Sequence, residues 1–205
     1  MLKFPHSKYK IRDANFELDY IKILTKVHKK LDIKKLVKLS NLFEKVINSN
    51  KRVFVLGNGG SAAVANHYVC DFNKNLSDLK NKKKPKFISL TNSIETITAI
   101  ANDINFNQIY VKQLENFFIK GDLILIMSCS GTSKNIIETL KFCKKKNAKV
   151  VFLTGFLKRK INYKFEIFIN LNCENYGICE DIFSTIMHIT CQKIKVRNSK
   201  KIKII

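Results

Sequence analysis

Five short apolar runs recur along the chain and alternate with segments of helical periodicity. The runs are rich in Val, Ile, Leu or Phe and lack polar alternation, which is typical of parallel strands covered on both faces. The predicted strands cover residues 52–56, 86–90, 122–127, 149–153 and 165–170. The predicted helices cover residues 61–74, 94–119 with a break near 102–105, 133–147 and 178–195. This alternation predicts an α/β fold, a doubly wound, mostly parallel five-stranded sheet with helices on both faces.

A helical segment precedes this alternation. Residues 15–50 carry two amphipathic patterns, so we expect two N-terminal helices before an α/β core over 51–195. The chain after Gln192 is basic, and we expect it to fray and to leave a basic tail over 196–205. With 205 residues, 45% of them hydrophobic, the sequence predicts a single domain, residues 1–205.

The formal net charge of +22 raises the question of nucleic-acid binding. Only four of the 38 basic residues are Arg, whereas recognition of base edges relies on the arginine fork. The excess is Lys, spread through a chain rich in Asn and Ile, as an A/T-rich genome produces on surface positions. We therefore expect no nucleic-acid partner, and we interpret the run Lys80–Lys86 as a solvated loop.

Neither a membrane span nor a signal peptide is predicted. No apolar run approaches the roughly 18 residues of a spanning helix, and the N-terminus lacks an apolar signal region. Six cysteines fall at irregular spacings without a C-x-x-C pair, which argues against a zinc ribbon and a thioredoxin-like site. We expect a cytoplasmic chain with reduced thiols.

The loop Gly57–Ser61 follows an apolar run directly and precedes a predicted helix. Such strand–turn–helix junctions bind anions, because glycine permits close approach and the first helical N–H groups lack internal partners. The spacing Gly57-x-Gly59-x-x-Ala62 also fits a dinucleotide fingerprint, but the second strand ends Ser89–Asn92 without the carboxylate that binds the ribose. No P-loop motif is present. We therefore do not expect a dinucleotide to be the ligand of this loop.

A second loop, Ser128–Ser133, carries four hydroxyl groups, one thiol and one glycine between a buried strand and a helix. Hydroxyls together with free backbone N–H groups form a phosphate cradle. The alternative is simple helix capping by Thr132 or Ser133, for which one hydroxyl would suffice. We expect a phosphate site.

His67 and Asp71 lie four residues apart on an otherwise apolar helix, which places both on one face. Polar groups on such a helix need partners. Two interpretations remain open from the spacing alone, a metal or catalytic pair and an ordinary His–Asp pair on the helix surface.

Taken together, these motifs resemble the sugar isomerase (SIS) family, and within it the phosphoheptose isomerases, over residues 15–195. The resemblance rests on two loops at the expected separation and on shorter matching stretches elsewhere. The matching stretches are Val55–Ala63, Ala99–Asp103, Gly121-Asp122 with Ser128–Ser133, Leu153–Gly155 and the last helix with His188. It implies a Rossmann-like SIS fold and a homotetramer whose active sites lie between subunits.

The resemblance also implies a substrate site for a phosphorylated sugar. The phosphate would bind Ser128, Cys129, Ser130 and Ser133, with Cys129 standing where the family usually has Thr. The sugar would meet a set of polar and backbone groups from two further loops. These are Asn58, Gly59, Gly60, Ser61, Asn102 and Asp103.

The metal ligands that the resemblance implies are His67, Asp71, Glu180 and His188. The phosphoheptose isomerases carry Glu and Gln at the second and third of these positions, so Asp71 and Glu180 are departures. The set suits zinc but also tolerates manganese or iron. Eight residues of helix span about 12 Å, so Glu180 and His188 could hardly reach one ion from one straight helix. Either Glu180 precedes the helix, or, as we favour, the two ligands come from different subunits.

The expected activity is aldose–ketose isomerisation of sedoheptulose 7-phosphate through an enediol. We assign the base to Asp71, with Glu180 as the rival, and the acid to His188. The loop Gly57–Ser61 would let the sugar approach the backbone and would begin the helix that carries His67. Two alternatives remain, an isomerase for another phosphorylated sugar and a non-catalytic SIS scaffold, such as one that binds a replication initiator.

Overall fold

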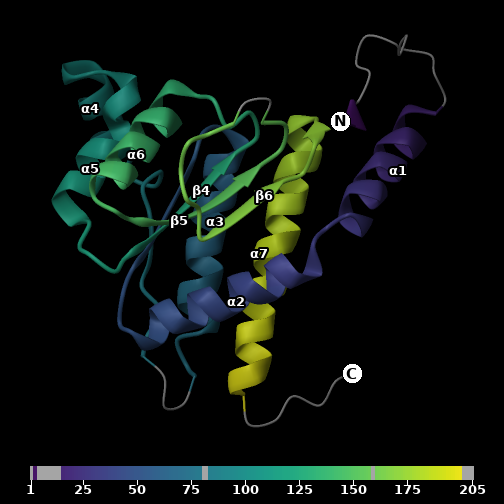
Figure 1. Cartoon of the computed structure of the whole chain (residues 1–205), viewed down its shortest axis with the longest axis horizontal. Helices are drawn as coiled ribbons and strands as arrows, with labels where there is room; N and C mark the ends of the chain where they lie inside the picture. Colours follow the sequence, from purple (N-terminus) through teal and green to yellow (C-terminus); the bar gives the residue numbers. More distant parts are fainter. Residues whose placement is uncertain (1, 4–14, 80–82, 158–159, 200–205) are drawn as a thin grey trace.

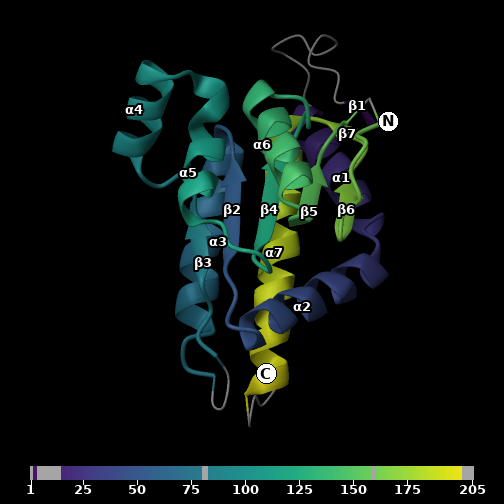
Figure 2. The same ribbon diagram turned by 60° about the vertical axis from the view of Figure 1, so that its left-hand side comes forward.

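A five-stranded parallel sheet forms the centre of the molecule in the computed structural model, which describes residues 2–3, 15–79, 83–157 and 160–199. The strand order is β3-β2-β4-β5-β6, and every neighbouring pair is parallel (Figures 1 and 2). The bounds are β2 Val53–Gly57, β3 Phe87–Ser89, β4 Leu123–Ser128, β5 Lys149–Thr154 and β6 Ile167–Asn170. The doubly wound parallel sheet predicted from the apolar runs is confirmed.

Burial on both faces explains why these strands read as unbroken apolar runs. In β4 every residue is buried, and alternate side chains enter different cores. Leu123 and Leu125 pack into one core with α2, α3 and α7, whereas Ile124 and Ile126 pack into the other with α5 and α6.

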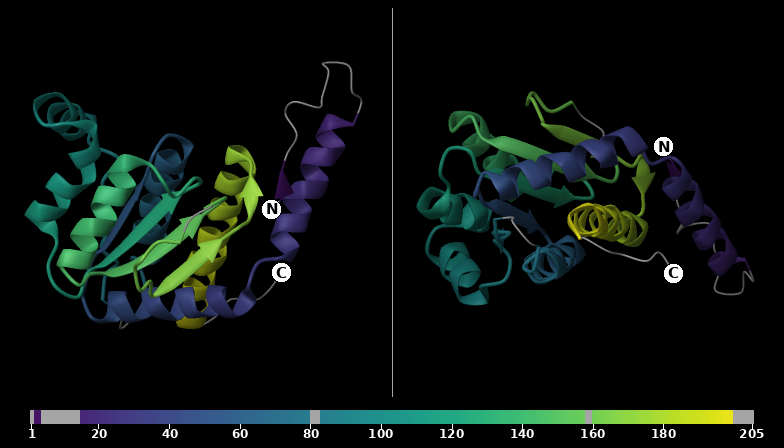
Figure 3. Two further views of the ribbon diagram at one scale, coloured as in Figure 1. Left: turned by 45° about the horizontal axis from the view of Figure 1, so that its top comes forward. Right: turned by 90° about the horizontal axis from the view of Figure 1, so that it is seen from below.

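Helices cover each face as the two cores require (Figure 3). The N-terminal helices are α1 Phe16–Lys29 and α2 Ile33–Asn48, and α2 begins at an Asp32 cap that accepts from the Lys35 N–H. The others are α3 Gly60–Asn75, α4 Ile94–Asp103, the 3₁₀ turn η1 Phe106–Gln108, α5 Ile109–Phe117, α6 Lys134–Lys145 and α7 Tyr176–Asn198. The break expected near 102–105 lies between α4 and η1. In Figure 1, α3 and α7 run side by side along the sheet, and α2 crosses α7 part-way along its length, with the last turns of α7 continuing below α2.

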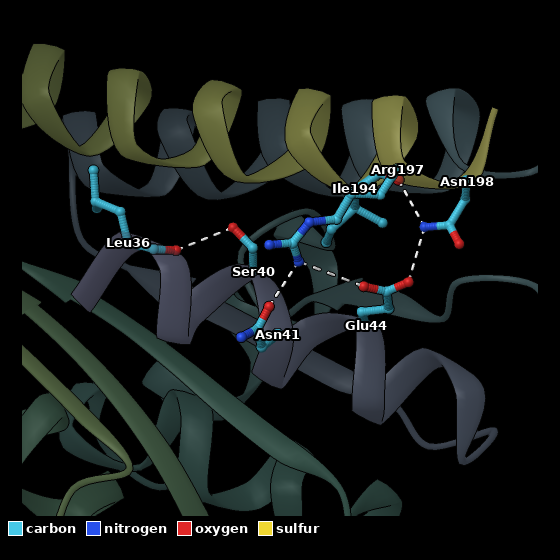
Figure 4. A network of polar contacts seen from close by, with 7 residues as sticks. All are labelled: Leu36, Ser40, Asn41, Glu44, Ile194, Arg197 and Asn198. Atoms are coloured by element: carbon cyan, nitrogen blue, oxygen red, sulfur yellow. Dashed lines mark hydrogen bonds and ion pairs between the residues drawn. The ribbon is translucent and has the colours of Figure 1, made fainter. Parts of the chain in front are cut away.

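The chain remains helical to Asn198, the last residue of α7. The expectations of fraying after Gln192 and of a tail beginning at residue 196 are therefore wrong up to that residue. Polar contacts with α2 stabilise this end (Figure 4). The Arg197 guanidinium donates to Asn41 Oδ1 at 2.6 Å and lies 3.8 Å from the Glu44 carboxylate. Asn198 Nδ2 donates to Glu44 Oε1 at 2.9 Å. Residues 200–205 of the expected tail lie outside the described residues.

A small parallel pair, β1 (Leu2–Lys3) with β7 (Cys173–Glu174), adds a second sheet that the sequence did not predict. Of the lysine-rich run expected to be a solvated loop, residues 80–82 lie outside the described residues, and 83–86 form an irregular segment. No helix in the described ranges is long and apolar enough to cross a bilayer.

Asparagine occupies the left-handed backbone positions. Among the described residues, the non-glycine residues with positive φ are Asn50, Asn147 and Asn172, with φ of 57°, 50° and 55°. Asn50 and Asn147 follow the C-caps of α2 and α6, where glycine is the usual residue. Asn tolerates this conformation because its short polar side chain can bond locally.

Candidate functional site

The predicted loops meet at the carboxyl edge of the sheet. Gly57 ends β2, Ser128 ends β4 and Thr154 ends β5; in the sheet register Ser128 pairs with Thr154, and Gly57 pairs with Met127, next to Ser128. Ligands of open α/β sheets bind outside this edge. The structure therefore brings the loop after β2 and the serine-rich loop 128–133 together.

The loop after β2 needs its glycines for two reasons. Gly59 has φ of +56°, a left-handed conformation, and caps α3. At Gly60, an added Cβ would lie 2.1 Å from Glu180 Oε2. The helix that follows therefore begins directly against the Glu180 carboxylate, which also accepts from Ser61 Oγ at 3.2 Å.

The serine-rich loop is folded back on itself by its own hydroxyls. Ser128 Oγ accepts from the Gly131 N–H at 3.2 Å, and Ser130 Oγ accepts from the Thr132 N–H at 3.3 Å. Ser133 occupies the N-cap of α6, yet its side chain makes no capping hydrogen bond. The simple capping interpretation therefore does not explain Ser133, whose hydroxyl and neighbouring N–H groups suit an anion.

Cys129 anchors this loop from below. It is buried, and its carbonyl accepts from the N–H groups of both Gly155 and Phe156 at 2.9 Å. Its thiol lies 3.7 Å from Ser61 Oγ, so the two loops touch here. The Cys129 thiol, which stands where the resemblance implies a threonine hydroxyl, thus points into the protein. The backbone of Cys129 joins the loop to the end of β5.

His67, Asp71 and His188 form a cluster between α3 and α7, with one ligand atom of each residue within 4.8 Å of the others. Asp71 Oδ2 lies 3.6 Å from His67 Nε2 and 3.4 Å from His188 Nε2. Two ligand atoms at about 2.1 Å from one tetrahedral zinc ion are roughly 3.4 Å apart, so these separations fit a shared ion. The surface His–Asp pair left open by the spacing is thus joined by a second imidazole from a distant helix.

Tyr68 supports the cluster from the buried side. Its ring lies 5.8 Å from that of His67 and 5.6 Å from that of His188, and its hydroxyl donates to the Ser184 carbonyl. Burial raises the pKa of the Tyr68 phenol, so the hydroxyl stays neutral and remains a donor. Tyr68 was not predicted from the sequence, although a tyrosine on a buried helical face signals a need for a polar partner.

Glu180 does not join this cluster within the described chain. It lies inside α7, eight residues before His188, which excludes the possibility that it precedes the helix. Burial raises the pKa of its carboxyl, and the hydrogen bonds from Ser61 partly oppose that shift. Asn102 and Asp103, at the end of α4, are exposed and hydrogen-bonded to each other at 2.8 Å.

Asn58 belongs to a polar network whose other members the sequence did not predict. Its amide exchanges two hydrogen bonds with the amide of Asn135, at 2.9 and 2.8 Å. The buried Tyr110 hydroxyl lies 2.6 Å from the Gly57 carbonyl and 2.9 Å from Asn58 Oδ1. These partners are 52 and 77 residues away in sequence, so no local pattern could reveal them.

Comparisons with known proteins agree with the predicted family and fold. The sequence model of the SIS domain matches residues 16–155. The chain is 30% identical to the probable phosphoheptose isomerase of Thermoplasma volcanium over 192 residues, 94% of this chain and 95% of that one. It is also 30% identical to that of Thermoplasma acidophilum over 80% of this chain and 89% of the other. The structure of phosphoheptose isomerase GmhA from Neisseria gonorrhoeae superposes with a TM-score of 0.78 at 25% identity, covering 89% and 96% of the two chains.

Proposed function

Since the chain belongs to the SIS domain family, we propose that it is an aldose–ketose isomerase that converts sedoheptulose 7-phosphate to D-glycero-D-manno-heptose 7-phosphate. The observation that carries this proposal is the convergence of His67, Asp71 and His188 between α3 and α7, on the helix that begins at the loop after β2 and the helix packed against it. Isomerisation needs a base, an acid and charge stabilisation next to an anchored phosphate. The cluster between α3 and α7 offers candidates for the first three roles, and the serine-rich loop at the sheet edge offers one for the phosphate.

The serine-rich loop anchors the phosphate in this proposal. Ser128, Ser130 and Ser133 contribute hydroxyls, the backbone N–H of Cys129 adds a further donor, and the N-terminus of α6 favours negative charge. Binding energy from this remote group positions the reacting carbons. The loop after β2 contacts the sugar through Asn58, Gly59, Gly60 and Ser61. Asn102 and Asp103 are proposed to contact the sugar as well.

Proton transfer falls to Asp71 and His188. Asp71 Oδ2 faces both imidazoles, which leaves Oδ1 to take the proton from one carbon and return it to the next. His188 moves the proton between the two oxygens. Glu180 is the rival base, because its raised pKa lies closer to the range in which a carboxyl group accepts and returns a proton.

The imidazoles and the Asp71 carboxylate would hold a divalent metal, and we propose zinc. Two nitrogens and one oxygen at the observed separations supply three ligands of a tetrahedral site and leave the fourth position for a ligand from elsewhere. When bound, the ion would act as a Lewis acid toward the sugar oxygens. Glu180 would supply a ligand from a neighbouring subunit.

We further propose a homotetramer with active sites at subunit interfaces. In the single chain the side chains of His67 and His188 remain 53% and 41% exposed, which is open for a metal centre. Ile189 and Val196 on α7 lie seven residues apart, on one helical face, and are 42% and 51% exposed. A partner subunit would cover both features. All six cysteines are free, which supports the cytoplasmic location proposed for this enzyme.

Metal analysis of the purified protein, combined with an isomerase assay on ketose phosphates of five to eight carbons, tests the proposal. We expect one zinc per chain and the highest kcat/KM on the seven-carbon substrate. A preference for another chain length would make it an isomerase of a different sugar. Absence of both metal and turnover would favour the scaffold function and contradict the proposal.

A further inference from the structure

The hydrogen bonds around Asn58 fix the orientation of its amide. The Ile136 backbone N–H donates to Asn135 Oδ1 at 2.9 Å, so this atom must be the oxygen. Asn58 therefore faces it with Nδ2, at 2.9 Å. Asn58 Oδ1 in turn accepts from Asn135 Nδ2 at 2.8 Å. One backbone donor on α6 thus determines how the amide in the loop after β2 is turned.

Tyr110 completes this arrangement from α5. Its single hydroxyl proton lies between the Gly57 carbonyl and Asn58 Oδ1, at 2.6 and 2.9 Å, and both of these atoms are acceptors. The residue is 2% exposed, and burial raises its pKa, so the proton stays in place. Oδ1 of Asn58 thereby faces two protein donors, Asn135 Nδ2 and the Tyr110 hydroxyl that it shares with the Gly57 carbonyl, whereas one N–H of Nδ2 remains without a protein partner among the described residues.

We propose that Tyr110 is a positioning residue that makes Asn58 a donor toward the sugar. The inference rests on the proposed function, since it assigns a chemical preference to the same site. Because two protein donors already face Oδ1, Asn58 offers its remaining N–H to a carbonyl or hydroxyl oxygen of the ligand rather than accepting from the ligand. The amide therefore selects for a substrate oxygen at this point and is oriented before the sugar arrives.

The test compares Tyr110→Phe with a matched control, Tyr163→Phe. Both hydroxyls donate to backbone carbonyls, but Tyr163 contacts Ala148, which precedes β5 at the opposite end of the sheet. Dissociation constants for sedoheptulose 7-phosphate and for inorganic phosphate are measured by calorimetry. We expect Tyr110→Phe to raise the dissociation constant of sedoheptulose 7-phosphate about tenfold and to change that of inorganic phosphate by less than about twofold. Tyr163→Phe should leave both constants within about twofold.

A double-mutant cycle with Asn58→Ala identifies the route of the effect. If Tyr110 acts through Asn58, Tyr110→Phe should add almost nothing once Asn58 is Ala. Additive losses, equal losses for the two ligands, or a Tyr110→Phe constant equal to wild type would overturn the inference.

Turnover by the wild-type enzyme reports separately on the proposed function. If wild type isomerises the substrate, Tyr110→Phe should raise KM with kcat within about twofold, because the lost orientation affects binding uniformly. If the wild type binds the sugar phosphate without turnover, the proposed isomerase function is wrong. The change in the two dissociation constants caused by Tyr110→Phe still tests the role of Tyr110. A protein that binds no sugar phosphate overturns both.

Discussion

At the scale of single residues, the Asp71 carboxylate joins the two proposed imidazole ligands. One oxygen faces two imidazoles from two helices, and the side chain is one methylene shorter than the Glu of the phosphoheptose isomerases it resembles. A displacement of about 1 Å at a reacting group can change a rate by about 100-fold. The packing of α3 against α7 brings His188 within reach of the shorter side chain, whereas His67 lies one turn away on α3 itself.

Replacing Asp71 with Asn separates the two candidate bases. We expect Asp71→Asn to lower kcat by about 10²- to 10⁴-fold, the usual contribution of a general base. Glu180→Gln should lower kcat by less than about tenfold. Steady-state kinetics on sedoheptulose 7-phosphate, with metal content measured for each variant, provides the comparison. A larger effect at Glu180 would transfer the role of base to that residue.

Glu180 also predicts a pH dependence of stability. Its pKa is raised by burial, so the folded state holds the proton more tightly than the unfolded state and the ionised form is penalised. The stabilising contribution of the protonated group is complete below the unfolded pKa of about 4.5 and is lost as pH rises through the folded value. We therefore expect Glu180→Gln to raise the melting temperature at pH 7 but not at pH 4. An equal shift at both pH values would contradict this assignment.

Residue spacing predicted part of the site and could not have predicted the rest. His67 and Asp71 share a helix, so their adjacency follows from the period of the helix alone. The approach of His188 to Asp71 depends on the packing of α7 on α3, and Glu180 was joined to that set only by resemblance. Tyr110 and Asn135 reach Asn58 through the sheet and its helices, and nothing in their own segments indicates this contact.

At the scale of elements, the strands were predicted to within about two residues because two-sided burial forces each to be apolar throughout. Helix ends were harder. Residues 193–198 look polar and basic, yet they form the end of α7 because Arg197 and Asn198 find partners on α2. The β1–β7 pair has two residues on each side, too few to produce any periodicity.

Arg197→Ala tests whether these contacts hold the end of α7. The ion pair and hydrogen bonds are partly exposed, so we expect a loss of only about 0.5–1 kcal/mol in the free energy of unfolding. Amide exchange in residues 193–198 should accelerate, while residues 178–190 stay protected. Lys193→Ala, a charge change of the same sign on the same helix, is the control and should leave exchange unchanged.

At the scale of the whole molecule, metal and assembly are coupled if the ligands come from two subunits. Removal of the proposed metal by a chelator should then abolish turnover, lower the melting temperature and shift the proposed tetramer toward smaller species in light scattering. Added zinc should reverse all three, with a stabilisation of about 2.7 kcal/mol at 100 times its dissociation constant. A monomer that still binds one metal per chain would contradict the shared site.

The left-handed asparagines have a consequence for how such sequences vary. Asn50, Asn147 and Asn172 occupy backbone conformations that cost most L-residues roughly 1–2 kcal/mol. Evolution can exchange them for glycine freely, but exchange for alanine or valine should be rare. Aligned sequences of relatives should therefore alternate between Asn and Gly at these three columns, while the surface lysines around them change without restriction.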